Sequence, residues 1–90
     1  MTLRHMKIIV AVFQQGSVTK AAESLHMAQP SVSLALRELE DYYGVELFAR
    51  VGRRLSPTEC GRAFYGYALH IVSVFDEMER YFEDFLRHDA

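Results

Sequence analysis

Apolar residues recur at intervals of three and four through the first half of the chain, which predicts amphipathic helices. The first helix is expected to begin after Thr2 as N-cap and to end at Gly16, because glycine readily adopts the left-handed conformation that terminates a helix. Ser17 can then cap a second helix. The residues predicted on the buried face of the first helix are Leu3, Met6, Val10 and Phe13.

Two further helices meet at a short turn made by residues 26–28, with the pair spanning about residues 18–37. The apolar face of the first of these consists of Val18, Ala21, Ala22 and Leu25. The next helix opens at Gln29-Pro30, where the missing N–H of proline is harmless, and ends at Gly44. Its predicted buried residues are Val32, Leu36, Leu39 and Tyr43, and its predicted outward residues are Gln29, Ser33, Leu34 and Arg37. A helix with such an outer face, packed on a helix with alanines at the crossing, is typical of a helix that enters a DNA major groove.

The pattern changes in the segment from about residue 46 to residue 57. Leu47, Phe48 and Leu55 are apolar anchors around a basic stretch, 50–54, that contains Gly52. Two short strands joined at this glycine would form a wing. The segment is too short for periodicity to separate a hairpin from an extended loop.

A long final helix is predicted from Glu59 to about Arg87, with Thr58 as its N-cap. Its apolar residues recur at spacings of 4, 3, 4, 3, 4 and 3, which is a heptad repeat: Phe64, Ala68, Ile71, Phe75, Met78, Phe82 and Phe85. A second stripe, Tyr67, Val74 and Tyr81, widens the apolar face. A preceding domain of fewer than 60 residues is too small to cover this helix, so we expect the helix to need a partner.

Composition limits the classes of protein that the chain can belong to. Ninety residues, half of them hydrophobic and 24% charged, suffice for one small folded domain with an appended element. No apolar run approaches the ~18 residues that span a bilayer and no secretory signal opens the chain, so we expect a cytoplasmic protein. No metal-ligand spacing, phosphate loop or nucleophile–base pair is present, so neither a cofactor nor enzymatic activity is expected. Cys60, the only cysteine, is expected to be a small buried hydrophobe rather than a redox sensor.

The net charge of −2 conceals a division of charge along the chain. Residues 1–58 carry seven Lys or Arg against five Asp or Glu, whereas residues 59–90 carry three against seven. The basic surplus therefore coincides with the helix pair and the wing, as expected if this part approaches nucleic acid.

The sequence resembles the N-terminal domain of the LysR-type transcriptional regulators throughout residues 1–61. The resemblance rests on Gly16-Ser17, Ala21-Ala22, Leu25, Gln29-Pro30-Ser31-Val32-Ser33, Leu39-Glu40, Gly44, Leu47-Phe48, Arg50, Arg53 and Thr58-Glu59-Cys60-Gly61, at continuous spacing. Residues 62–90 are similar to the linker helix of that family in position and pattern. Two departures are Ala28, where the family often has a capping Ser or Thr, and Cys60, where alanine is usual.

The resemblance implies a mainly α-helical fold: a winged helix-turn-helix over residues 1–58, followed by a dimerisation helix over residues 59–90. It also implies a transcriptional activator or repressor that binds an interrupted palindrome in double-stranded DNA as a homodimer or a tetramer. Members of the family normally continue into a domain that binds a small-molecule effector. That domain is absent from these 90 residues, so we expect the chain to be a fragment.

The residue types suggest how such a domain would contact DNA. The candidates for base reading are Gln29, Pro30, Ser33 and Leu34, because glutamine pairs with adenine, serine with either base type, and apolar groups with thymine methyls. The candidates for backbone contacts are Ser17, Thr19, Ser31 and Arg37. Arg37 has an alternative role in an ion pair with Glu40 or Asp41, and Leu34 has one in packing on a neighbouring loop.

The wing candidates for the minor groove are Arg50, Arg53 and Arg54. The family resemblance assigns this role to Arg53, and Arg50 has an alternative role in bracing the wing on the domain. Two other functions remain open from the pattern. One is DNA binding as a member of another winged-helix repressor family, and the other is protein interaction through the long helix.

Overall fold

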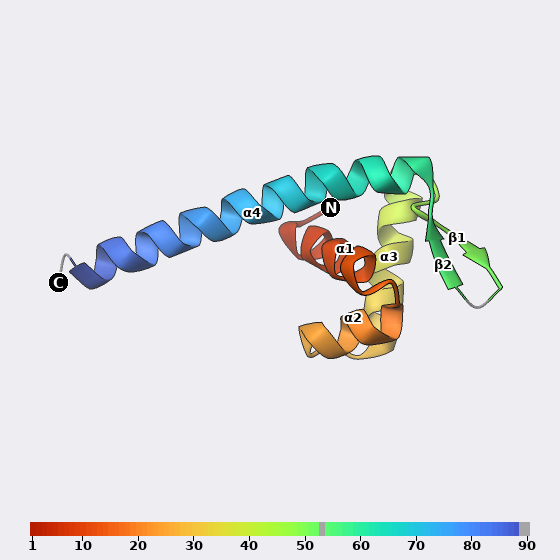
Figure 1. Cartoon of the computed structure of the whole chain (residues 1–90), viewed down its shortest axis with the longest axis horizontal. Helices are drawn as coiled ribbons and strands as arrows, with labels where there is room; N and C mark the ends of the chain where they lie inside the picture. The colour runs from red at the N-terminus through yellow and green to blue at the C-terminus, as the bar shows by residue number, and fades with distance from the viewer. Residues whose placement is uncertain (53, 89–90) are drawn as a thin grey trace.

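The chain folds into a helical head from which one long helix projects. The computed structural model describes residues 1–52 and 54–88. In chain order the elements are α1 (Leu3–Gln15), α2 (Val18–Leu25), α3 (Gln29–Tyr43), β1 (Phe48–Val51), β2 (Arg54–Pro57) and α4 (Glu59–His88). Helices α1–α3 cluster at one end of α4, the two strands extend from the same end, and the rest of α4 runs away from the head (Figure 1). The mainly α-helical fold predicted from the sequence is confirmed.

Local sequence signals set the ends of the helices. Thr2, Ser17 and Thr58 precede α1, α2 and α4, and each hydroxyl accepts a hydrogen bond from the backbone N–H three residues further on. Gly16 and Gly44 end α1 and α3 with positive φ angles of 67° and 66°. Each of these residues has the role expected from the sequence.

The turn between α2 and α3 lacks a side-chain N-cap. His26 ends α2 in the left-handed conformation, with φ at 55°. Ala28 precedes α3 and supplies no side-chain hydrogen bond, as its methyl group dictates. In the first turn of α3, the backbone N–H groups of Ser31 and Val32 both donate to the Ala28 carbonyl, at 3.0 and 3.3 Å, and Pro30 has no N–H of its own.

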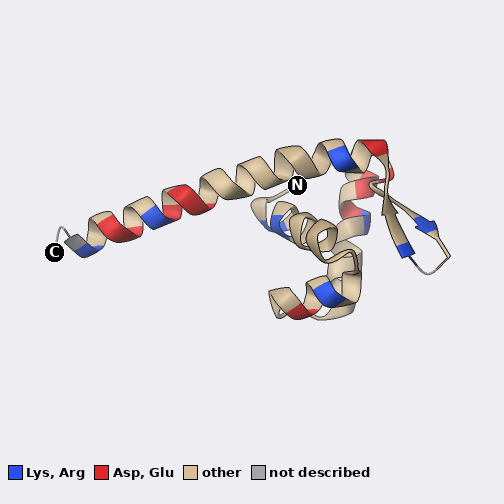
Figure 2. Cartoon of the chain, viewed as in Figure 1, with Lys and Arg blue, Asp and Glu red and all other residues tan. Residues whose placement is uncertain are grey.

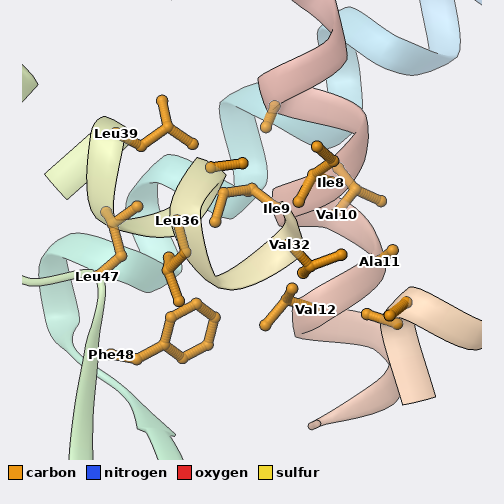
Figure 3. Packing of buried hydrophobic residues seen from close by; sticks show 14 residues of the cluster. Ile8, Ile9, Val10, Ala11, Val12, Val32, Leu36, Leu39, Leu47 and Phe48 are labelled. Atoms are coloured by element: carbon orange, nitrogen blue, oxygen red, sulfur yellow. The ribbon is translucent and has the colours of Figure 1, made fainter. Parts of the chain in front are cut away.

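The hydrophobic core lies where α1 crosses α2, α3 and the start of α4. The largest fully buried side chains are Ile9, Val12, Val32, Leu39 and Leu47, and Figure 3 shows those of α1 and α3 facing one another. The expected core face of α1 is confirmed in part. Val10 is buried, Met6 and Phe13 are half-buried and pack against the core, and Leu3 is half-buried. In addition, the whole central segment 8–12 is buried, because α1 contacts α2, α3 and α4.

Two expectations about burial were wrong. Tyr43 is 47% exposed, because the last turn of α3 reaches the edge of the head; there its ring lies beside those of Tyr42 and Phe64, at 4.8 and 5.8 Å between centroids. Cys60, expected to be buried, lies exposed on the first turn of α4. The amino-acid type alone does not tell whether a tyrosine or a cysteine lies at the edge of the core or at its centre.

Strands β1 and β2 form an antiparallel hairpin, which settles the choice between a hairpin and an extended loop. Phe48 pairs with Pro57 and Val51 with Arg54, and Gly52 follows β1 with a φ of 65°. Phe48 anchors the base of this wing, with its ring 4.4 Å from that of Phe13. Packing between residues far apart in sequence thus holds the hairpin in place, and the spacing of apolar residues within the segment does not reveal this packing.

The beginning of α4 is fastened to the loop before β1. Thr58 donates its backbone N–H to the Leu47 carbonyl and its hydroxyl to the Glu46 carbonyl. Further along α4, Ala68 is only 1% exposed, and Lys7 of α1 lies 4.9 Å from the ring centroid of Phe75. Past this contact, α4 leaves the head. Among the described residues, no helix combines the length and apolar character needed to cross a membrane.

Candidate nucleic-acid interface

The outer face of α3 is exposed, as predicted. The side chains of Gln29, Pro30 and Leu34 lie in solvent, with Leu34 52% exposed, and Ser33 is half-buried. Leu34 lines a surface pocket together with Met27 of the turn before α3, so part of its side chain lies beside that loop while about half of it stays exposed. The opposite face of α3 is held in the core by Val32, Ala35, Leu36 and Leu39. The amide of Gln29 donates a hydrogen bond from Nε2 to Ser33 Oγ at 2.9 Å.

The N-terminus of α2, the N-terminus of α3 and the wing meet around one open surface pocket of about 200 Å³. Its lining residues are Gly16, Ser17, Val18, Thr19, Gln29, Arg50 and Leu55. Ser17 and Thr19, predicted to contact the DNA backbone, therefore lie beside the base-reading candidate Gln29. This pocket joins hydroxyl groups, helix N-termini and one guanidinium, which together favour an anionic group.

Arg37 is exposed on the third turn of α3. Glu40, one of its two possible ion-pair partners, is engaged elsewhere. Glu40 Oε2 accepts hydrogen bonds from the backbone N–H groups of Leu47 and Phe48, at 2.7 and 3.4 Å. Within the part of the chain that the structure describes, Arg37 forms no ion pair. Its guanidinium is therefore available at the surface, and Ser31 is exposed on the first turn of the same helix.

The wing carries exposed cations on both strands. Arg50 in β1 and Arg54 in β2 are exposed, and Arg50 also lines the pocket beside the helix N-termini. Arg53, to which the resemblance assigns the minor-groove role, lies outside the described residues. Figure 2 shows the blue wing residues at the head end of the molecule, whereas most of the red acidic residues of α4 lie toward its far end.

The apolar surface of α4 differs from the predicted heptad seam. Ala68 is buried within its own head, so it is not free to contact a partner, whereas Phe64 and Phe75 are half-buried. The burial of Ala68 has a physical reason: α4 packs on α1 at this position. Seven large apolar residues left exposed form a seam that includes the second stripe, and they are Tyr67, Ile71, Val74, Met78, Tyr81, Phe82 and Phe85. Leu86 is exposed as well but lies off this seam.

This exposed seam is continuous. Its residues are between 41% and 74% exposed. Six of them, at positions 67, 71, 74, 78, 81 and 85, follow alternating spacings of 4 and 3, so they lie along one face of the helix. Tyr67, Val74 and Tyr81 were recognised in the sequence only as a widening of another stripe. Their spacing of seven residues is the sequence signal that could have identified them as part of the exposed seam.

No group of three or more His, Cys, Asp or Glu side chains in the described parts of the chain is arranged to hold a metal ion. The surface features are instead a polar helix face, a neighbouring pocket that suits an anion, a basic hairpin and an apolar seam. Together with the order of the elements, they define a winged helix-turn-helix module with a long C-terminal helix.

Comparison with known proteins identifies the family of this module. Residues 3–62 match the model of the bacterial regulatory helix-turn-helix proteins of the lysR family. The RuBisCO operon transcriptional regulator of Allochromatium vinosum is 42% identical over 82 residues, which are 91% of this chain and 27% of that protein. The HTH-type transcriptional regulator BenM of Acinetobacter baylyi is 41% identical over 78 residues, which are 87% of this chain and 26% of that protein. The chain belongs to the lysR family and spans about a quarter of the length of these relatives.

Solved structures agree with this assignment. The BenM DNA-binding domain in complex with benA site 1 DNA superposes with a TM-score of 0.87 at 37% identity, covering 96% of this chain and 97% of that one. The CbnR DNA-binding domain, also in complex with DNA, gives a TM-score of 0.83 at 30% identity and covers 93% of this chain and 97% of the other. The helical head, wing and long helix thus recur together in these proteins.

Proposed function

We propose that the chain binds specific sequences in double-stranded DNA and regulates transcription, with α3 in the major groove and the wing in the adjacent minor groove. The observation that carries this proposal is the outer face of α3, which is exposed, polar and flanked by a basic wing. The relatives support it, since two domains of the same fold were crystallised with DNA and others are named transcriptional regulators. Such a regulator would act in the cytoplasm.

Four residues on α3 would form the base-reading surface. Gln29 can pair with adenine N6 and N7 through its amide, and Ser33 lies one turn further along the same face. Pro30 and Leu34 offer apolar surface to thymine methyl groups. Leu34 is 52% exposed, and this apolar surface on the outer face of α3 favours a contact with DNA.

A separate group of residues would fix the position of the head on the phosphate backbone. Ser17 and Thr19 line the pocket beside the N-terminus of α2, where free N–H groups also favour a phosphate. Ser31 and Arg37 on α3 would contact the strand on the other side of the groove. These contacts set register and orientation but read no sequence.

The wing arginines would act in two ways. Arg50 lines the pocket with Ser17 and Thr19, which favours a phosphate contact for it over bracing of the wing. Arg54 at the start of β2, and Arg53, which precedes it in the sequence, would approach the minor groove and respond to its width. The wing would thereby favour A·T-rich DNA next to the site that α3 reads.

The exposed seam of α4 would pair with the same seam of a second copy. A homodimer built in this way carries two heads at a fixed separation, so that it reads two half-sites of an interrupted palindrome. Two such dimers would form a tetramer in a longer protein, where a small-molecule effector would bind a domain outside these 90 residues.

Binding to the DNA upstream of the gene for this protein, measured by fluorescence anisotropy at several salt concentrations, tests the proposal. We expect specific binding that weakens steeply between about 50 and 200 mM salt. Gln29→Ala should weaken it about 5- to 100-fold, the equivalent of ~1–3 kcal/mol, because a base contact is lost. Gln14→Ala, the same change at an exposed position of α1, serves as the control and should bind normally.

A second pair of variants tests the wing. Arg54→Ala should weaken binding to all sequences and lower the salt dependence by about one counterion, whereas Arg80→Ala on the far half of α4 should change neither. If the unmodified chain shows no preference for any sequence, or if Gln29→Ala binds as tightly as Gln14→Ala, then α3 is not the reading helix.

A further inference from the structure

Gln29 and Ser33 are joined by a hydrogen bond on the outer face of α3. Nε2 of Gln29 donates to Ser33 Oγ at 2.9 Å, across one helical turn. Gln29 is exposed and would otherwise rotate about three side-chain bonds, whereas Ser33 is half-buried and has only one such bond. The short, partly buried side chain of Ser33 therefore restricts the rotation of the long, exposed side chain of Gln29.

This bond changes what the Gln29 amide can offer to a base. A free glutamine amide has two N–H donors and one carbonyl acceptor. Since Ser33 takes one N–H, the amide keeps one N–H and the carbonyl. That remaining pair complements adenine, which presents the N7 acceptor and the N6 donor side by side in the major groove.

Guanine is excluded by the same bond. Guanine presents two acceptors, N7 and O6, at the corresponding positions. An untethered amide could turn both Nε2 hydrogens toward these two atoms. When Ser33 occupies one of the hydrogens, only one donor is left and the amide carbonyl faces the repulsive O6 atom.

We infer that Ser33 is a positioning residue for Gln29, and that the pair makes this chain select adenine over guanine at the base pair that Gln29 reads. The inference rests on the proposed function, because it requires Gln29 to lie in the major groove. It assigns the contribution of Ser33 to the orientation of the neighbouring amide rather than to a base contact of its own.

The test measures base preference instead of affinity alone. Selection from duplexes with randomised half-sites, carried out with the unmodified chain and with Gln29→Ala, identifies the base pair whose preference depends on Gln29. Two labelled duplexes that differ only at this pair, A·T in one and G·C in the other, are then compared in competition. We expect the unmodified chain to prefer the A·T duplex about tenfold or more.

Ser33→Ala should lower this preference at least threefold, mainly because the G·C duplex binds more tightly. Ser33→Thr keeps the hydroxyl group and should restore the preference. In a Gln29→Ala background, Ser33→Ala should leave the ratio of the two affinities unchanged, since there is no amide left to hold. Ser73→Ala, the same change on an exposed position of α4, is the control for the substitution itself.

Two results would overturn the inference. One is an unchanged preference in Ser33→Ala, and the other is an equal change whether or not Gln29 is present, which would make Ser33 an independent base reader. Both leave the proposed function intact. The proposed function itself fails only if the unmodified chain selects no sequence from the randomised duplexes.

Discussion

At Gly61 the start of α4 lies close to the backbone of Leu47. This glycine is buried, and a Cβ atom there would overlap the carbonyl oxygen of Leu47 and lie 2.9 Å from the carbonyl carbon. The Leu47 carbonyl cannot retreat easily, because it accepts the backbone N–H of Thr58 at 3.0 Å. We therefore expect Gly61→Ala to lower the free energy of unfolding by about 2–3 kcal/mol through overpacking.

Gly66→Ala is a control for which we expect the opposite change in the free energy of unfolding. Gly66 is exposed on the same helix, and an added Cβ would meet nothing within 4 Å. Alanine should therefore raise the free energy of unfolding by about 0.5–1 kcal/mol, because it reduces the backbone entropy of the unfolded chain. Urea denaturation at one fixed protein concentration measures both variants. Destabilisation by both to the same extent would mean that the Leu47 contact is not the cause.

At the scale of single residues, sequence reasoning predicted exposure better than it predicted burial. The exposed positions of Gln29 and Leu34 follow from helical spacing within one element. The errors at Tyr43 and Cys60 arose because burial depends on neighbouring elements. Tyr43, for example, is spaced correctly for the core, but α3 outlasts the core by one turn.

Glu40 ties α3 to the segment that leads into the wing. Its carboxylate accepts from the backbone N–H groups of Leu47 and Phe48, two buried residues at the base of the wing. Glu40→Ala would leave the Leu47 N–H without this partner. We expect it to lower the free energy of unfolding by about 1–3 kcal/mol, the cost of an unsatisfied buried donor.

Glu40→Gln keeps an acceptor oxygen and should lose only part of this stability, because its hydrogen bonds are no longer charge-assisted. Asp41→Ala removes an exposed carboxylate from the next position of α3 and should change stability by less than about 0.5 kcal/mol. Thermal denaturation of the three variants checks the order. Equal losses for Glu40→Ala and Asp41→Ala would show that the two loop N–H groups do not depend on Glu40.

At the scale of elements, the sequence predicted the helices well and the hairpin only as one of two possibilities. Helix ends are marked locally, as at Ser17 and Gly44, so neighbouring residues suffice to find them. The four-residue strands of the wing have no comparable local signal. They are held by Phe48 against α1, a contact between residues far apart in sequence.

For the whole molecule, the placement of α4 decides which apolar residues remain for a partner. The heptad repeat seen in the sequence mixes residues that pack on the head, such as Ala68, with residues that face solvent, such as Met78. Periodicity reports that a helix has an apolar face, but not which part of that face its own domain covers. Only the packing of α4 on α1 identifies the exposed seam.

A charge placed in this seam should therefore separate the proposed dimer. Val74 is exposed at the middle of the seam, and Ser73 is its exposed neighbour outside the seam. Val74→Lys would bury an ammonium group between two apolar helices, so we expect the dimer dissociation constant to rise about a hundredfold or more. Ser73→Lys adds the same charge toward solvent and should leave it unchanged. Sedimentation equilibrium over a range of protein concentrations measures both.

The same two variants connect association with DNA reading. In a dimer, the second head binds its half-site at an effective concentration set by the rigid helix pair, which raises affinity by about 10²-fold or more over a single half-site. Val74→Lys should lose this gain on a palindrome of two half-sites but bind one isolated half-site as well as the unmodified chain, because its head is unchanged. Ser73→Lys should keep the gain. If Val74→Lys is monomeric yet still binds the full palindrome at full affinity, then the α4 seam does not set the spacing of the two heads, and contacts between the heads on DNA must do so instead.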